Sequence, residues 1–64
     1  MIYRIKVYTG KKPFSAVIIK CGDEYLKGVK ADLQDEKISF LDLENIIIPK
    51  SEIRSIVVKK ISEN

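Results

Sequence analysis

The chain has 64 residues, of which 45% are hydrophobic and 33% charged, with a net charge of +3 at pH 7. This balance predicts one folded domain over residues 1–64 and argues against disorder, and no apolar run approaches the ~20 residues that cross a bilayer. A single cysteine, Cys21, leaves no partner for an internal disulfide, and the early charges do not fit a secretory signal, so we expect a cytoplasmic protein.

The first part of the chain predicts two strands. Residues 2–8 alternate, with Arg4 and Lys6 opposite an apolar face, which is the period-two pattern of a half-buried strand. Residues 9–13 form a turn with glycine and proline. Residues 14–21 predict the second strand, and because both of its faces are partly apolar, it is either central in a sheet or covered by a partner chain.

The middle of the chain predicts two further strands. Residues 24–33 form the third, interrupted by Gly28, which inside a strand marks a bulge or a bend. Residues 37–42 form the fourth, followed by a turn in which Asn45 suits a left-handed conformation. No segment of helical length shows a convincing helical stripe, so we expect no α-helix.

The last third predicts a strand, one tight turn and a final strand. Three isoleucines at 46–48 suit a buried pleated surface, and Pro49 ends that strand because it cannot donate to a ladder. Residues 50–53 fit one 3₁₀ turn before a sixth strand at 54–60. The tail at 62–64 is expected to fray.

These elements together predict an all-β fold. Five to six short antiparallel strands, with one 3₁₀ turn before the last strand, are typical of a small barrel. In such a barrel the first and last strands usually lie close together, so residues distant in sequence meet on one surface.

Charge is distributed unevenly along the chain. Residues 1–22 hold five cations and no acid, residues 23–45 hold seven acids and three cations, and residues 46–64 hold four cations and two acids. If the two ends meet, their cations merge into a patch that attracts phosphates or an acidic partner. The alternative is that these lysines only solvate edge strands and discourage aggregation.

A basic patch with an aromatic residue suits nucleic acid, because bases stack on aromatic rings while cations contact phosphates. Tyr8 lies on the same strand face as Arg4 and Lys6, so we expect it to be the aromatic residue on which a base stacks. The candidate nucleic-acid contacts are Arg4, Lys6, Tyr8, Lys11, Lys12, Lys27, Lys30, Lys50 and Arg54.

Residues for catalysis are missing from the sequence. There is no histidine, and none of the common phosphate-binding, nucleophile or paired-cysteine motifs occurs. Cys21 lies in phase with two apolar residues and is expected to be structural. We therefore expect a binding protein rather than an enzyme, without a cofactor or a metal.

Two apolar strands offer surfaces for self-association. A small β-protein without disulfides often gains stability by associating, so we expect a homo-oligomer. The candidate interface residues are Ala16, Ile18, Ile46, Ile47 and Ile48.

Several segments resemble Sm-like proteins, including the bacterial host-factor type of RNA chaperone. Residues 17–22 resemble the first Sm strand and its turn, Gly28 falls where that family bends, and residues 50–57 resemble the second signature. Residues 48–56 equally resemble the closing segment of SH3-like PRC-barrel domains, which mostly mediate protein contacts. The first resemblance implies RNA binding by an oligomer of small barrels, and the second a protein-interaction or assembly module without a nucleic-acid role.

Overall fold

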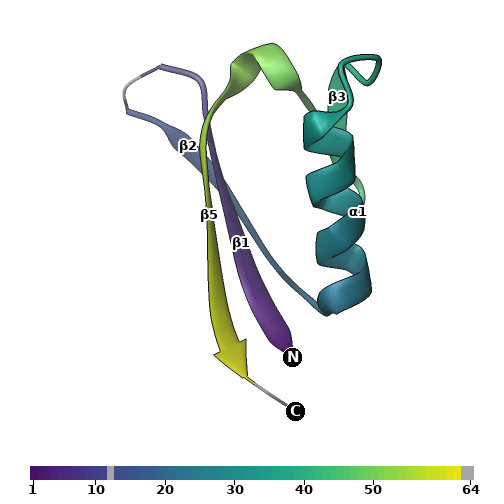
Figure 1. Cartoon of the computed structure of the whole chain (residues 1–64). Coiled ribbons are helices and arrows are strands. Elements are labelled where there is room, and N and C mark those ends of the chain that lie inside the picture. The colour runs from purple at the N-terminus through teal and green to yellow at the C-terminus, as the bar shows by residue number, and fades with distance from the viewer. Residues whose placement is uncertain (12, 63–64) are drawn as a thin grey trace.

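The computed structural model describes residues 1–11 and 13–62, and for Ser62 the backbone only. The elements follow one another along the chain with short connections (Figure 1). Their order is β1 (Ile2–Thr9), β2 (Ser15–Cys21), α1 (Asp23–Gln34), β3 (Phe40–Leu43), β4 (Ile46–Pro49), the 3₁₀ helix η1 (Lys50–Glu52) and β5 (Ile53–Ser62).

β1 is the centre of a three-stranded antiparallel sheet, with β2 on one side and β5 on the other. The start of β1 and the end of β5 lie at the same end of the molecule (Figure 1). The predicted proximity of the first and last strands is therefore confirmed, as are the two N-terminal strands. β5 forms an edge of the sheet and extends to Ser62, which pairs with Ile2, so the predicted fraying does not apply to residue 62. Glu63 and Asn64 lie outside the described residues.

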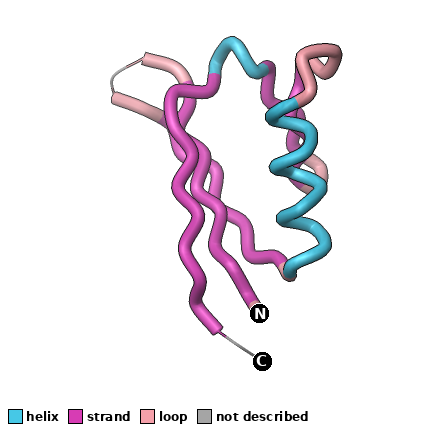
Figure 2. Tube along the Cα trace, viewed as in Figure 1, coloured by secondary structure: helices cyan, strands magenta, loops and turns pink. Residues whose placement is uncertain are grey.

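The second sheet is a hairpin of β3 and β4. The hairpin and α1 lie on the same side of the three-stranded sheet, and η1 leads from β4 to β5 (Figure 2). The apolar faces of all three parts meet in one core, where each fully buried aliphatic side chain contributes about 1.5–3 kcal/mol. The core residues are Ile5, Val7, Ile19, Leu26, Val29, Leu41, Leu43 and Ile48.

The prediction of a strand at 24–33 is wrong, because this segment forms α1. Leu26, Val29 and Leu33 recur at the spacing of one helical face, and the first two are buried in the core. Asp23 and Glu24 occupy the first turn, where the helix dipole favours negative charge. Gly28 lies on the exposed side of the helix and marks no bend in a strand.

The helix also overturns the all-β prediction, although the fold is mostly β. The strands of residues 1–11 and 13–62 form two separate antiparallel sheets and no closed barrel. The 3₁₀ turn before the last strand is confirmed as η1, and β4 ends at Pro49 as predicted, with the proline as its last residue.

Two turns differ in detail from the prediction. The fourth strand begins at Phe40 and not at residue 37, because Lys37 donates its backbone N–H to the Asp35 side chain (2.9 Å) in a polar turn. In the β3–β4 turn the positive φ of 57° falls at Glu44, and Asn45 has no positive φ. The Glu44 backbone N–H is held by the Tyr25 hydroxyl of α1, which accepts it at 2.8 Å.

No helix in the described part of the chain is long and apolar enough to span a bilayer.

Candidate functional site

The three-stranded sheet has a buried face and an outer face. Ile5 and Val7 of β1 are fully buried against α1 and the hairpin, so the alternate residues of β1 lie on the opposite side. Residues opposite one another in register share a face, which extends this assignment to β2 and β5. We call this outer surface the basic sheet face. It consists of Arg4, Lys6, Tyr8, Ala16, Ile18, Lys20, Ser55, Val57 and Lys59.

The strand register orders this face into rows across the sheet. Arg4 pairs with Lys20 on β2 and with Lys59 on β5, so three cations form one row. Neighbouring strands lie about 4.8 Å apart, so the row spans roughly 10 Å. Like charges at directly opposite positions destabilise a sheet, and an anion bound across the row would relieve that repulsion.

The next two rows combine apolar and basic chemistry. Lys6 lies between Ile18 and Val57, which are both exposed, and Tyr8 lies between Ala16 and Ser55. The rows therefore grade from three cations at one end, through a lysine with apolar neighbours, to an aromatic ring at the other.

The ammonium of Lys6 lies over the Tyr8 ring, 5.0 Å from its centroid. At an exposed site such a cation–π contact is worth about 0.5–1 kcal/mol. Tyr8 is half-buried, so part of its ring remains accessible to solvent.

Electrostatically, the sheet differs from the rest of the molecule. β1, β2 and β5 carry six arginines and lysines and no aspartate or glutamate, whereas residues 23–45 carry seven acids and three lysines. Because α1 and the hairpin lie on the buried side of the sheet, the acidic part faces away from the basic sheet face. The merging of the basic ends, expected from the sequence, therefore occurs on this sheet.

The predicted contact residues fall into separate groups. Arg4, Lys6 and Tyr8 lie together on the basic sheet face, and Lys11 is exposed in the β1–β2 loop. Lys12 lies outside the described residues. Lys27 and Lys30 are exposed on α1, in the other layer of the molecule, so the structure does not bring them to the basic sheet face.

Lys50 binds the C-terminal end of α1. Its ammonium donates to the backbone carbonyls of Asp32 and of Asp35, the latter at 2.8 Å. The last carbonyls of a helix have no partner within it and carry partial negative charge, so a cation there stabilises the helix. The half-buried Lys50 is thus a cap of α1, supplied by η1.

Arg54 holds the β1–β2 loop. Its Nε donates to the carbonyl of Gly10 at 2.7 Å, and the backbone N–H of Gly10 donates to the carbonyl of Glu52 at 3.0 Å. Gly10 has φ of +81°, which favours glycine. The register of β1 and β5 shifts at this point, so Arg54 lies at an irregularity of the ladder and ties the loop to η1 and β5.

Sequence reasoning did not include Lys20 and Lys59 among the contacts. The sequence contained part of the necessary information, because alternation along the strand places Lys20 on the same face as Ile18 and on the opposite face from Ile19. The missing information was the register, which places both lysines opposite Arg4.

The predicted interface residues also separate. Ala16 and Ile18 lie on the basic sheet face, whereas Ile46 and Ile47 lie on the hairpin, in the other layer. Ile48 is only 6% exposed and belongs to the core, so it offers no surface to a partner.

The outer side of the hairpin is a second exposed surface, which we call the hairpin outer face. Its residues, in register, are Phe40 opposite Pro49 and Asp42 opposite Ile47. Phe40 is 54% exposed and Ile47 is 66% exposed. In the described part of the chain β4 pairs with β3 alone, so its other edge has no ladder partner.

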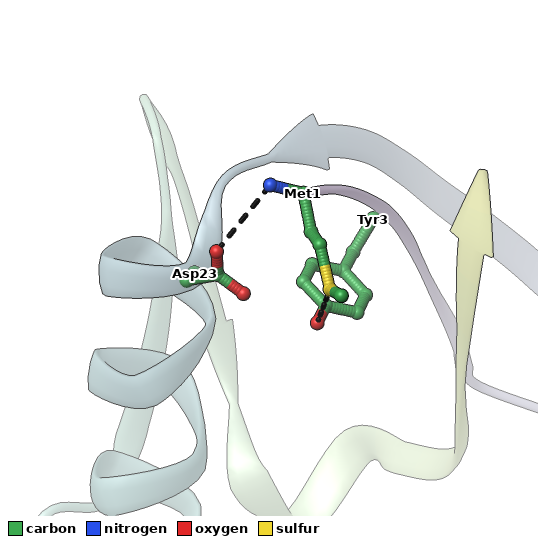
Figure 3. Close-up of polar contacts among 3 residues, drawn as sticks. All are labelled: Met1, Tyr3 and Asp23. Carbon is green, nitrogen blue, oxygen red and sulfur yellow. Dashed lines mark hydrogen bonds and ion pairs between the residues drawn. The ribbon is translucent and has the colours of Figure 1, made fainter. Parts of the chain in front are cut away.

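Near the start of α1, the Met1 amino group lies 3.4 Å from Asp23 and the Tyr3 hydroxyl 3.2 Å from the Met1 sulfur (Figure 3). The pKa of Tyr3 is raised, first by hydrogen bonding to the Asp23 carboxylate and then by desolvation and the charge of Asp23. The pKa of the Cys21 thiol is raised by burial and by the charges of Asp23 and Glu44. A raised pKa keeps this thiol protonated and weakly nucleophilic, in line with a structural role.

The described residues enclose no pocket. Comparisons with protein-family models, with curated proteins and with solved structures gave no match to this chain. The fold and the surface therefore define a class of protein, namely a small β-rich protein with one helix and a basic, partly apolar sheet face.

Proposed function

We propose that this protein is a non-enzymatic nucleic-acid-binding module that uses the basic sheet face. The observation that carries the proposal is the row of Arg4, Lys20 and Lys59 on a sheet without a single acidic residue. Cations presented side by side on an open surface suit the phosphates of RNA or DNA, which supply affinity without sequence choice.

Salt dependence follows from this chemistry. Binding releases about one counterion for each phosphate neutralised, so the logarithm of the affinity falls linearly with the logarithm of the salt concentration. With four cationic side chains on the face engaged, the slope should be about 3 to 4 in magnitude. The cytoplasm, where nucleic acid is available, is the location that we propose with this function.

The test compares two variants with the same loss of charge. The face variant carries Arg4→Gln, Lys20→Gln and Lys59→Gln, and the control carries Lys27→Gln, Lys30→Gln and Lys37→Gln in the other layer. Fluorescence anisotropy with a labelled RNA or DNA strand at low salt should show a loss of affinity of at least about tenfold for the face variant, because its phosphate contacts are gone. Its salt slope should fall to about 1 in magnitude.

The control should bind within a few-fold of the wild type, because a change of net charge alone acts only through long-range attraction, which salt screens. Equal losses in both variants would contradict the proposed site. Absence of binding by the wild type to both RNA and DNA at low salt would contradict the proposed function.

The second candidate is assembly with other protein chains, and the hairpin outer face supports it. Phe40 and Ile47 are large apolar side chains exposed to solvent on a hairpin in which β4 has no second ladder partner among the described residues. We propose a second copy of this chain as the partner. The likeness to SH3-like and Sm-like proteins stays a prediction, supported by the strand, 3₁₀ turn and strand at β4, η1 and β5.

A further inference from the structure

We infer that the basic sheet face takes single-stranded rather than double-stranded nucleic acid, with one base stacked on Tyr8 and the backbone directed toward the cation row. This inference rests on the proposed function and narrows its ligand. The evidence is the grading of the face from an aromatic ring to three cations, and the small size of the side chains beside the ring.

Tyr8 has the smallest neighbours of any central position on the face. Its cross-strand partners are Ala16 and Ser55, whereas Lys6 lies between two β-branched residues. Directly opposite side chains lie about 5 Å apart at Cβ, so a bulky partner would stand against the ring. Ala16 and Ser55 have small side chains, so they leave space beside the Tyr8 ring for a flat ligand the size of a base.

The Lys6 ammonium over the ring does not prevent stacking. Its contact is the weaker one, because a cation–π pair at an exposed site gains less than a base stacked on an aromatic side chain. A base can therefore displace the ammonium, which then becomes available to the phosphate next to that base. Tyr8 and Lys6 would act together, the first on the base and the second on the backbone.

The length of the face sets the size of the bound strand. Tyr8 and Arg4 are four residues apart on β1, which corresponds to roughly 14 Å along the strand. Stacked nucleotides of one strand rise about 3.4 Å each, so the distance from the ring to the cation row covers about four of them. This number lies at the lower end of the site sizes of single-strand-binding barrels, about 4–16 nucleotides.

A duplex does not present an exposed base face on which the Tyr8 ring could stack. Its bases are stacked on one another inside the helix, and only phosphates and groove edges are accessible. A duplex on the basic sheet face would therefore present its phosphates to the cations but no base face to the ring. Single-strand binding should therefore depend on Tyr8, and duplex binding should not.

The experiment measures the affinity of the full chain for one labelled mixed-sequence strand of about twelve nucleotides, free and annealed to its complement. Tyr8→Val removes the aromatic ring and keeps a residue that suits a strand, whereas Tyr8→Phe keeps the ring. Phe40→Val is the matched control, because it removes an exposed aromatic from the other layer. Circular dichroism establishes that each variant is folded.

We expect the wild type to prefer the free strand. Tyr8→Val should weaken binding of that strand by roughly 5- to 150-fold, which is the loss of one stacked base. Tyr8→Phe and Phe40→Val should stay within about threefold of the wild type, and duplex binding should change little in any variant.

The outcomes separate the two proposals. Equal binding of both forms, or a Tyr8→Val variant that binds the free strand as the wild type does, overturns the single-strand inference and leaves nucleic-acid binding in place. Failure of the wild type to bind either form overturns both. Binding of the free strand that depends on Phe40 and not on Tyr8 moves the site to the hairpin and overturns the inference.

Discussion

At the scale of single residues, similar side chains have different uses according to their partners. Lys50 and Lys20 are both basic, but the first donates to the carbonyls of Asp32 in α1 and of Asp35 just beyond it, and the second lies exposed beside Arg4. An ammonium that already makes charge-assisted hydrogen bonds is less available to phosphate than an exposed one. This difference decides which of the basic residues belong to the proposed site.

The role of Lys50 gives a prediction on stability. Lys50→Met keeps most of the apolar stem and removes the ammonium, so the carbonyls of Asp32 and Asp35 lose their charged donor and keep only backbone donors. The free energy of unfolding should fall by about 1.5–3 kcal/mol, given the typical value of hydrogen bonds from a charged group. Urea unfolding measures this loss, and Lys27→Met, which removes an exposed lysine of the same helix, should leave the midpoint within error.

Nucleic-acid binding by the same variants provides the counter-test. Lys50→Met should lose no more affinity than Lys27→Met does, because each removes one charge outside the basic sheet face. A Lys50→Met variant that unfolds like the wild type but binds nucleic acid much more weakly would return Lys50 to the site predicted from the sequence.

At the scale of elements, Gly28 lies in a helix where alanine would fit better. A Cβ added to Gly28 meets no atom within 4 Å, and glycine costs about 0.5–1 kcal/mol relative to alanine inside a helix. Gly28→Ala should therefore raise the free energy of unfolding by that amount. For a domain of this size, the melting temperature should rise by about 4–8 °C per kcal/mol, as measured by thermal circular dichroism.

Gly10→Ala is the matched control for Gly28→Ala. Space is also free around Gly10, but its φ of +81° strains any residue with a Cβ, so this substitution should lower the melting temperature. A Gly28→Ala variant that melts lower than the wild type would contradict the helical assignment of this segment, and would favour the strand with a bend predicted from the sequence.

The sequence predicts β1, β2 and η1 well because their signals are local. The helix is different, because residues 24–33 satisfy two periods at once: Tyr25, Val29 and Leu33 fit alternation, and Leu26, Val29 and Leu33 fit a helix. The acidic first turn favoured the helix, but its last turn contains no cation. The cation comes from Lys50, too far along the chain for a local pattern to reveal.

The candidate site was likewise predictable only where local sequence patterns determine it. Arg4, Lys6 and Tyr8 share one strand, so alternation alone places them on one face. Lys20 and Lys59 join them only through the register of two strand pairs, which depends on packing against the helix and the hairpin. Because residues 24–33 were predicted to form a strand and not a helix, Lys27 and Lys30 were expected on the same barrel surface as Arg4 and Lys6.

At the scale of the whole molecule, the two layers present opposite chemistry. The sheet offers cations around a few apolar groups, whereas residues 23–45 of the other layer carry seven acids against three lysines, and Phe40 and Ile47 are exposed on its hairpin. A chain of 64 residues buries a limited core, and the apolar side chains exposed on the hairpin are one surface by which association would add to it.

The last prediction concerns this association. If copies of the chain assemble through the hairpin outer face, sedimentation at micromolar concentration should give a mass above the 7.3 kDa of one chain. Ile47→Lys should return the protein to a monomer, because a lysine at the centre of an apolar contact would have to be desolvated. Ile18→Lys, which adds the same charge to the basic sheet face, should leave the mass unchanged. A wild type that sediments as a monomer, or a dissociation caused by Ile18→Lys instead, would show that the hairpin outer face is not the contact between copies.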